Sequence, residues 1–228
     1  MVTTILMDLD DTILDFKECE KQALFVSLIS FGVTPSDEMR ESYSKINDKM
    51  WKLLEKGEIT RDELRVRRFA EFFTIFSIDA DPSAFADSYM QNLSQTAVFS
   101  DGAEAVLKEL SEKYDLYAVT NGYVSTQRGR IRAAGLDRFF KSVFISEEIG
   151  FNKPDERFFI NAFKDVPDFK REESVILGDS LTSDILGGKN FGIKTVWFNR
   201  TGTENRKGIF PDYEIFSLKE FEELVYKI

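Results

Sequence analysis

The hydrophobic pattern of the chain changes near residue 15 and again near residue 100. Residues 2–7 form a short uncharged run rich in β-branched side chains, which predicts a buried strand. From Asp15 to about Ala97 no similar run occurs, and apolar residues recur at helical spacing. The pattern therefore predicts one strand followed directly by a helical bundle.

Four helices are expected in this segment, and turn and capping residues delimit them. Gly32 ends the first helix and Gly57 ends the second, while Thr60 and Asp81 precede the third and fourth. The bundle also carries a stripe of Phe residues and Trp51. Packing inside the bundle explains this stripe more simply than a ligand site does.

After residue 100 the pattern becomes an alternation of strands and helices. Apolar runs predict strands at 114–119, 142–145, 173–177 and 194–198, with helices between them and a closing helix near 218–224. Such alternation is typical of a parallel sheet with helices on both faces. We therefore expect a five-stranded α/β core into which the helical bundle is inserted after the first strand.

Composition is that of a globular protein without membrane contact. The chain has 228 residues, of which 43% are hydrophobic and 31% charged. No apolar run approaches the length of a membrane span, and the N-terminus lacks the pattern of a signal peptide. These features predict a cytoplasmic protein with no membrane partner.

The lack of histidine and the near absence of cysteine restrict the catalytic chemistry. The chain contains no histidine and a single cysteine, Cys19, which excludes histidine-dependent nucleophiles, histidine zinc sites and multi-cysteine metal sites. Acid and base catalysis must therefore use carboxylates, lysine or tyrosine.

The charge balance is acidic. A net charge of −10 argues against a nucleic-acid duplex as partner, because a phosphate backbone requires a basic face. One basic run in the third helix is expected to be a solvated face rather than a substrate clamp: Arg61, Arg65, Arg67 and Arg68.

Polar residues follow the predicted strands at the points where these end. In an open α/β sheet the carboxyl ends of the strands form the edge where ligands bind. Taken singly, these residues have structural explanations as turn residues, helix caps or loop lysines. Their shared placement predicts a site built from six residues: Asp8, Asp10, Thr120, Lys153, Asp179 and Asp184.

Phosphoryl transfer suits this set. It requires an in-line nucleophile, an acid for the leaving group and positive charge for the phosphate oxygens. Without histidine, Asp8 is the expected nucleophile and Asp10 the expected proton donor and acceptor. Like charges about 4 Å apart repel by roughly 4 kcal/mol at an effective dielectric constant near 20, so the carboxylates need a cation. Carboxylate and phosphate oxygens are ligands of Mg²⁺.

The same residues resemble the four signature motifs of the haloacid dehalogenase-like hydrolase superfamily, whose members are mostly magnesium-dependent phosphatases. Asp8-Leu9-Asp10-Asp11-Thr12 is similar to the first motif, Thr120 to the second, Lys153 to the third, and residues 178–184, Gly-Asp-Ser-Leu-Thr-Ser-Asp, to the fourth. The resemblance spans nearly the whole chain. The helical insert resembles the cap of that family, while Asp11 is expected to be only a turn residue.

The resemblance implies a fold and a domain division. It implies a doubly wound, Rossmann-like sheet with strand order 3-2-1-4-5. The catalytic core is expected to comprise residues 1–14 and 98–228, and the helical cap residues 15–97. The cap of this family closes over the site and contacts the leaving group, which places specificity in the cap.

The resemblance also implies roles. The Mg²⁺ ligands would be the Asp8 carboxylate, the Asp10 backbone carbonyl and Asp179, with Asp184 acting directly or through water. Lys153 would offset the charge between Asp8 and the phosphate. Phosphate oxygens would be bound by Thr120 and by the backbone N–H of Asn121. No role follows for Asn152.

Residues 145–150 and 183–188, together with Trp51, look most like the pyrimidine 5'-nucleotidase branch. The expected activity is hydrolysis of small phosphomonoesters, above all pyrimidine nucleoside 5'-monophosphates, through an aspartyl-phosphate. The alternatives are a sugar phosphomutase and a phosphatase of sugar or acylneuraminate phosphates. A dehalogenase, a phosphonate-cleaving enzyme and a phospho-receiver domain fit the motifs or the length less well. The chain is expected to be a monomer or a homodimer.

Overall fold

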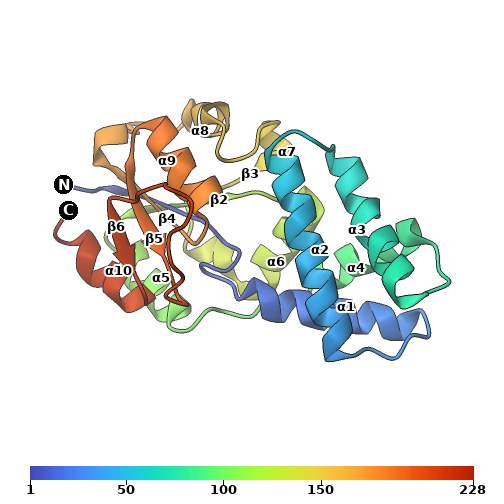
Figure 1. Ribbon diagram of the computed structural model, residues 1–228. Helices are drawn as coiled ribbons and strands as arrows, with labels where there is room; N and C mark the ends of the chain where they lie inside the picture. The colour runs from blue at the N-terminus through green and yellow to red at the C-terminus, as the bar shows by residue number, and fades with distance from the viewer.

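A six-stranded parallel sheet forms the centre of the computed structural model, which describes all 228 residues. The strand order is β3-β2-β1-β4-β5-β6, as Figure 1 shows. The strands are β1 (Thr4–Met7), β2 (Asp115–Thr120), β3 (Ser142–Ile145), β4 (Ser174–Gly178), β5 (Lys194–Phe198) and β6 (Tyr213–Ile215).

The structure confirms the expected order of the first five strands and corrects their number. β6 contains only three residues and pairs with β5 at the edge, where Val196 is opposite Tyr213 and Phe198 is opposite Ile215. A run of three residues is too short to show a strand periodicity. For this reason the sequence predicts five strands, although the sheet has six.

Helices cover both faces of the sheet, as expected for a doubly wound fold. Alternate residues of β1 point to opposite faces, so Ile5 and Met7 join one hydrophobic cluster and Leu6 joins another. The helices on the first face are α5 (Ala103–Ser111), α6 (Val124–Ala134) and α10 (Leu218–Val225). Those on the second face are α8 (Glu156–Phe163) and α9 (Leu186–Phe191), and the short helix α7 (Ser146–Ile149) follows β3.

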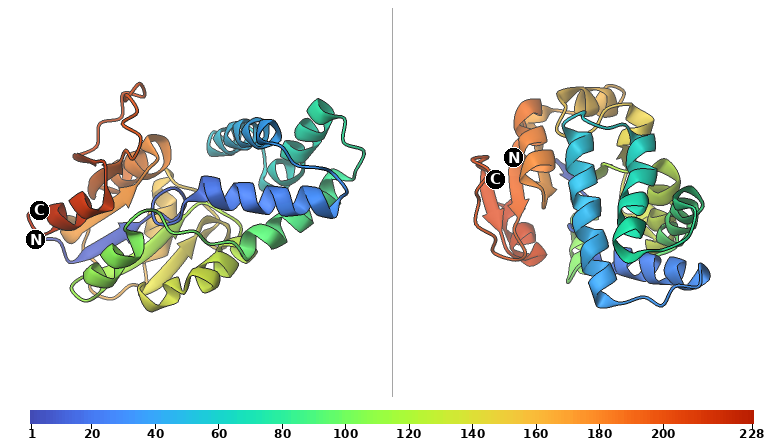
Figure 2. Two further views of the ribbon diagram at one scale, coloured as in Figure 1. Left: turned by 90° about the horizontal axis from the view of Figure 1, so that it is seen from below. Right: turned by 45° about the vertical axis from the view of Figure 1, so that its right-hand side comes forward.

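Four helices between β1 and β2 form the expected bundle. They are α1 (Phe16–Ser30), α2 (Asp37–Glu55), α3 (Arg61–Phe76) and α4 (Pro82–Ser94). Figures 1 and 2 show them together at one end of the sheet. All four begin at caps: the Asp15, Ser36 and Asp81 side chains accept backbone N–H groups, and Thr60 forms a capping box with Glu63.

The bundle has a hydrophobic cluster of its own. Its Phe stripe lies inside that cluster, where the rings of Phe69 and Phe85 are 5.0 Å apart and those of Phe73 and Phe85 are 5.1 Å apart. This arrangement supports the expectation that the stripe is the core of the bundle. The division at residues 14/15 and 97/98 stays a prediction.

The bundle and the sheet domain approach closely at α4 and α6. A Cβ atom on Gly129 of α6 would lie 2.5 Å from the backbone oxygen of Ser94 at the end of α4. Only glycine permits this approach of two backbones. The contact places the bundle beside the carboxyl ends of the strands.

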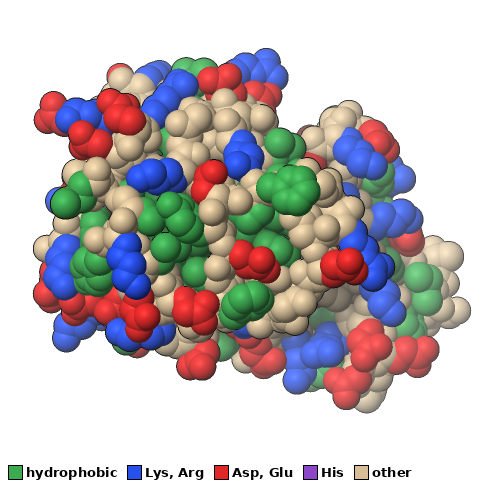
Figure 3. Space-filling model, turned by 60° about the vertical axis from the view of Figure 1, so that its left-hand side comes forward, with side chains coloured by type: hydrophobic (Ala, Val, Ile, Leu, Met, Phe, Trp, Pro, Cys, Tyr) green, Lys and Arg blue, Asp and Glu red, His purple; other side chains and the backbone are tan.

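None of the helices has the length and apolar character needed to cross a bilayer. On the face drawn in Figure 3, acidic and basic side chains are interspersed and form no continuous basic surface. This distribution agrees with the net charge of −10.

Candidate active site

The first two carboxylates lie in the turn that follows β1. The Asp8 N–H donates to the Leu177 carbonyl at 2.9 Å, which continues the pairing with β4, and the residue is only 6% exposed. The chain then reverses at Asp11, whose φ is 59° and whose Oδ1 accepts the N–H of Phe16 at 3.1 Å. Asp11 therefore serves the turn, as expected, and it lines the cavity beyond the sheet together with Asp8 and Asp10.

Lys153 connects the strand ends. Its Nζ donates to Asp8 Oδ1, to Asp184 Oδ1 and to the Val119 carbonyl, each at 2.7 Å, and the side chain is 1% exposed. Although burial lowers it, the carboxylates of Asp184 and Asp8 raise the pKa of Lys153 above its ordinary value. The ammonium is therefore a fixed positive charge between two of the acids.

Asn121 holds Lys153 in position through its side chain. Its Oδ1 accepts the Lys153 N–H and its Nδ2 donates to the Lys153 carbonyl, both at 2.9 Å. The sequence suggested only a backbone contact to phosphate for Asn121. The structure adds that the amide side chain joins the loop after β2 to the loop before α8.

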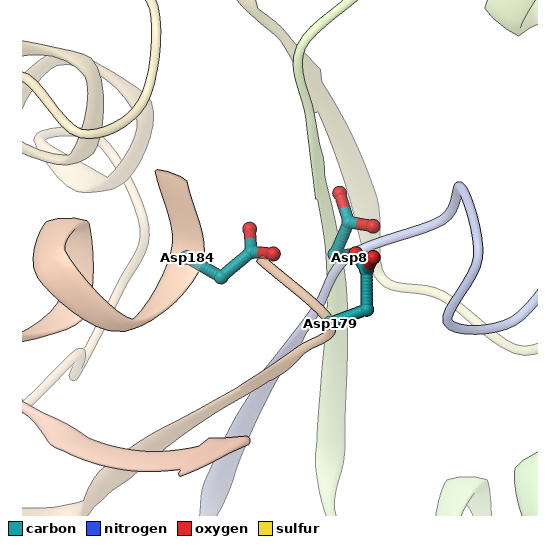
Figure 4. A group of neighbouring side chains, drawn as sticks. All are labelled: Asp8, Asp179 and Asp184. Atoms are coloured by element: carbon teal, nitrogen blue, oxygen red, sulfur yellow. The ribbon is translucent and has the colours of Figure 1, made fainter. Parts of the chain in front are cut away.

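Three carboxylates gather where β1 and β4 end, as Figure 4 shows. Ligand oxygens of Asp8, Asp179 and Asp184 all lie within 4.8 Å of one another. A Cβ on Gly178 would lie 2.3 Å from the Asp184 carboxyl carbon, so only glycine allows Asp184 to lie against the strand end. The set is compact enough to hold one cation.

The two later acids differ in their hydrogen bonds. Asp184 uses both oxygens, because Oδ1 accepts from Lys153 Nζ and Oδ2 accepts from the Ser180 N–H at 3.1 Å. The Asp179 carboxylate accepts no hydrogen bond from the protein, and only its backbone oxygen is bound, by Trp197 Nε1 at 2.7 Å. Asp179 can therefore coordinate a metal directly, and Asp184 is better placed to act through water.

The electrostatic balance of the three carboxylates also favours a bound cation. Burial raises the pKa of Asp8 to about 8, and burial together with the charge of Asp8 raises the pKa of Asp179 well above its usual range. Lys153 alone cannot balance three carboxylates. The donor set consists of oxygen atoms only, which a hard divalent cation such as Mg²⁺ prefers.

Asp10 is held by two residues of α6 that sequence reasoning missed. Gln127 Nε2 donates to Asp10 Oδ2 at 2.9 Å and to Thr120 Oγ1 at 2.6 Å, and Arg130 Nη1 forms an ion pair with Asp10 Oδ1. Gln127 and Arg130 are 2% and 1% exposed. Their spacing of three residues on a helix that starts at the strand end was the available signal, since it puts both on one helical face.

The cavity lies between the sheet domain and the bundle and has a volume of about 370 Å³. Thr120 is buried behind Gln127 and is absent from its lining, whereas the other six predicted site residues all line it. The bundle contributes a second wall, which includes Asn47, Trp51, Lys52, Glu55 and Arg68.

The expectation of a solvated arginine face was wrong for two of the four arginines. Arg68 is 3% exposed and lines the cavity. Arg61 donates to the Gly122 carbonyl at 3.1 Å and to Ser146 Oγ at 2.5 Å, and it also bonds Asn152 Oδ1. Asn152 thus has a role as a partner of a bundle residue.

The sequence matches a known protein family and is similar to characterised proteins over nearly its full length. Residues 5–198 match the family described as haloacid dehalogenase-like hydrolase. The chain is 38% identical over 224 residues to the pyrimidine 5'-nucleotidase PynA of Streptococcus pneumoniae, covering 98% of this chain and 94% of that protein. It is 29% identical to the pyrimidine 5'-nucleotidase YjjG of Escherichia coli, covering 98% and 97%.

Among solved structures, the crystal structure of YfnB from Bacillus subtilis bound to magnesium superposes with a TM-score of 0.94 at 37% identity. The superposition covers 100% of this chain and 99% of that one. The likeness therefore extends over both the sheet domain and the bundle.

Proposed function

This chain belongs to the haloacid dehalogenase-like hydrolase family, and from that premise we propose that it is a magnesium-dependent phosphatase of small phosphomonoesters. The observation that carries the proposal is the compact group of Asp8, Asp179 and Asp184 in the cavity, in which Lys153 contacts Asp8 and Asp184. It combines a carboxylate nucleophile with oxygen ligands for a cation.

Asp8 is the proposed nucleophile. Its Oδ1 is held by Lys153, and its Oδ2 accepts no hydrogen bond from the protein. Oδ2 would attack phosphorus in line with the ester oxygen, so that the Oδ2–P bond forms while the P–O bond to the leaving group breaks. The product of this step is an aspartyl-phosphate.

Asp10 is the proposed proton carrier. It would give its proton to the departing ester oxygen and then take one from the water that hydrolyses the aspartyl-phosphate. Gln127 and Arg130 hold both oxygens of its carboxylate on the side of α6. These contacts would fix the direction in which Asp10 approaches the leaving group.

The residues present fit magnesium. The Asp8 carboxylate, the Asp10 backbone carbonyl and Asp179 would hold the ion, with Asp184 acting through water because Lys153 and Ser180 occupy its oxygens. The bound ion would neutralise charge that develops on the phosphate oxygens. Magnesium bound to YfnB supports this assignment.

The remaining predicted residues would stabilise the phosphate and its surroundings. Lys153 would offset the negative charges of Asp8 and the phosphate. The Asn121 N–H would donate to a phosphate oxygen. Thr120 is buried behind Gln127 and would act on the phosphate through the Gln127 side chain, which donates a hydrogen bond to it. The division into a core, residues 1–14 and 98–228, and a cap, residues 15–97, is part of the proposal, as is a monomeric or homodimeric state.

The proposed substrates are pyrimidine nucleoside 5'-monophosphates. Two relatives that align over nearly the full chain carry the name pyrimidine 5'-nucleotidase. The bundle wall, with Trp51 and polar side chains, offers an aromatic surface that suits a flat base.

A screen of phosphate esters tests the proposal. The purified protein is incubated with dUMP, UMP, dTMP, hexose phosphates, an acylneuraminate phosphate and p-nitrophenyl phosphate, and released phosphate is measured with Mg²⁺ present. The nucleotides are expected to give the highest kcat/KM. Asp8→Asn serves as the blank, because the amide can keep its contact to Lys153 but cannot attack.

The outcomes are distinct. A preference for hexose or acylneuraminate phosphates would replace the nucleotidase assignment by a sugar-phosphate phosphatase. Interconversion of hexose phosphates without phosphate release would indicate a phosphomutase. Substantial turnover by Asp8→Asn would remove Asp8 as nucleophile.

A further inference from the structure

The bundle wall of the cavity contains a buried arginine that the proposed chemistry at Asp8 does not use. Arg68 of α3 is 3% exposed, lines the cavity and forms no ion pair with a carboxylate. A guanidinium taken out of water loses hydration that its protein partners must replace. A buried guanidinium with too few protein partners therefore has N–H donors left for a ligand.

The protein satisfies only part of Arg68. Nη1 donates to Asn47 Oδ1 at 2.9 Å, Nε is buried without an acceptor, and Nη2 forms no hydrogen bond with the protein. The guanidinium carbon lies 4.9 Å from the ring centre of Phe69 and 5.2 Å from that of Tyr89. These rings and Asn47 hold the group in place while leaving N–H donors unused.

Asn47 links Arg68 to a buried acid. Its Nδ2 donates to Glu20 Oε1 at 2.9 Å, which fixes the orientation of the amide so that its oxygen faces Arg68. The unit of Arg68, Asn47 and Glu20 thus joins the guanidinium to a buried acidic residue. Asp48, Lys52 and Glu55 also line the cavity on α2, so this wall carries charges of both signs. This wall is suited to a neutral acceptor such as a carbonyl oxygen rather than to a second anion.

Resting on the proposed phosphatase function, we infer that Arg68 determines specificity by donating a hydrogen bond from Nη2 to a ring carbonyl oxygen of a uracil-type base. Trp51, on the same wall, supplies an aromatic face for the ring. An ester without a base carbonyl leaves Nη2 unpaired. Discrimination then follows, because a site built to donate a hydrogen bond binds poorly to a ligand that lacks the acceptor.

The test compares substrates as well as variants. The kcat and KM for UMP, ribose 5-phosphate and p-nitrophenyl phosphate are measured with the wild type, Arg68→Met and Arg68→Lys. The matched control is Arg67→Met, since Arg67 is exposed on the same helix. In both Arg68 variants kcat/KM for UMP is expected to fall about 10- to 100-fold, mainly through KM. The two esters without a base should change less than about threefold.

Several results would overturn the inference. An equal fall for all three esters would mean that Arg68 only supports the cap, and a larger fall for ribose 5-phosphate or p-nitrophenyl phosphate than for UMP would mean that it does not recognise the base. If both Arg68 variants lost all turnover, the substrate preference of the wild type would test the inference. It must then favour UMP over ribose 5-phosphate by at least about 10-fold, and equal rates would refute base recognition. A wild type that hydrolyses no ester would refute the phosphatase proposal itself, together with this inference.

Discussion

Arg61 and Gly122 are joined by a hydrogen bond of 3.1 Å from Nη1 to the carbonyl oxygen, although one belongs to the bundle and the other to the loop after β2. The Tyr123 hydroxyl returns a hydrogen bond to the Arg61 carbonyl at 2.8 Å. The start of α3 is thereby fixed to the loop that carries Asn121. The two walls of the cavity are consequently held at a defined separation.

Replacing Arg61 by Ala is expected to lower kcat/KM for a nucleotide about 10- to 100-fold, because three hydrogen bonds between the walls are lost. Steady-state kinetics provides the measurement. Arg67→Ala, on the exposed side of the same helix, is the control and should leave the rate unchanged. Wild-type kinetics in Arg61→Ala would show that these contacts do not matter for turnover.

Removal of divalent cations should abolish activity, and added Mg²⁺ should restore it, since Asp8, Asp179 and Asp184 share one small volume with a single lysine. In Asp179→Asn the Mg²⁺ concentration for half-maximal rate should rise at least about 10-fold, because a carboxylate ligand is lost. A titration of rate against Mg²⁺ measures this. Asp165→Asn changes an exposed acid and is the control; activity that persists in EDTA would contradict the assignment.

Arg130→Met should impair alkyl phosphates more than aryl phosphates. Arg130 pairs with Asp10, and a misplaced Asp10 cannot protonate a poor leaving group, whereas p-nitrophenolate departs without a proton. We expect kcat for UMP to fall about 100-fold and kcat for p-nitrophenyl phosphate to fall about 10-fold or less. Arg128→Met removes an exposed ion pair with Glu148 and is the matched control. Equal losses on both substrates would indicate a structural role for Arg130.

Glu20 should make stability depend on pH. Burial raises the pKa of Glu20 from 4.5 to about 7, so between these values the unfolded chain releases a proton that the folded chain keeps. The free energy of unfolding should therefore fall as the pH rises from about 4.5 to about 7, by roughly 2 to 3 kcal/mol.

Denaturant unfolding of Glu20→Gln tests this relation. The amide cannot ionise and can still accept from Asn47, so the variant should be less sensitive to pH than the wild type and relatively more stable at pH 8 than at pH 5. Parallel pH curves for the two proteins would show that Glu20 does not carry the effect.

The sequence was sufficient to locate the catalytic edge, because parallel strands deliver their carboxyl ends to one place. Asp8 and Asp179 come together for that reason, and a local pattern is enough to find each strand end, while Lys153 reaches Asp8 from the loop between α7 and α8. The caps at Thr60 and Asp81 were equally readable, since a capping interaction involves only residues a few positions apart.

The walls of the cavity were less accessible to sequence reasoning. Arg68 stands four residues from both Leu64 and Phe72, which are buried on the same face of α3, so its position did signal burial. The prediction gave more weight to the charge of Arg68 than to its position on the helix, because arginine is usually exposed. Gln127 and Arg61 act through partners far away in the chain, and β6 depends on pairing with β5. Such contacts exist only in the folded molecule.

The insertion of the bundle between β1 and β2 has a consequence for the order of folding. Thr4 must pair with Asp115, yet every residue of the four helices lies between them. The contacts among these helices join residues that lie closer in the chain than Thr4 and Asp115, whose pairing must close a longer loop. We expect the bundle to form first and to shorten that loop before the sheet assembles. Pulse-labelling hydrogen exchange should then show amides of α2 and α3 protected earlier than those of β1, and simultaneous protection would refute this order.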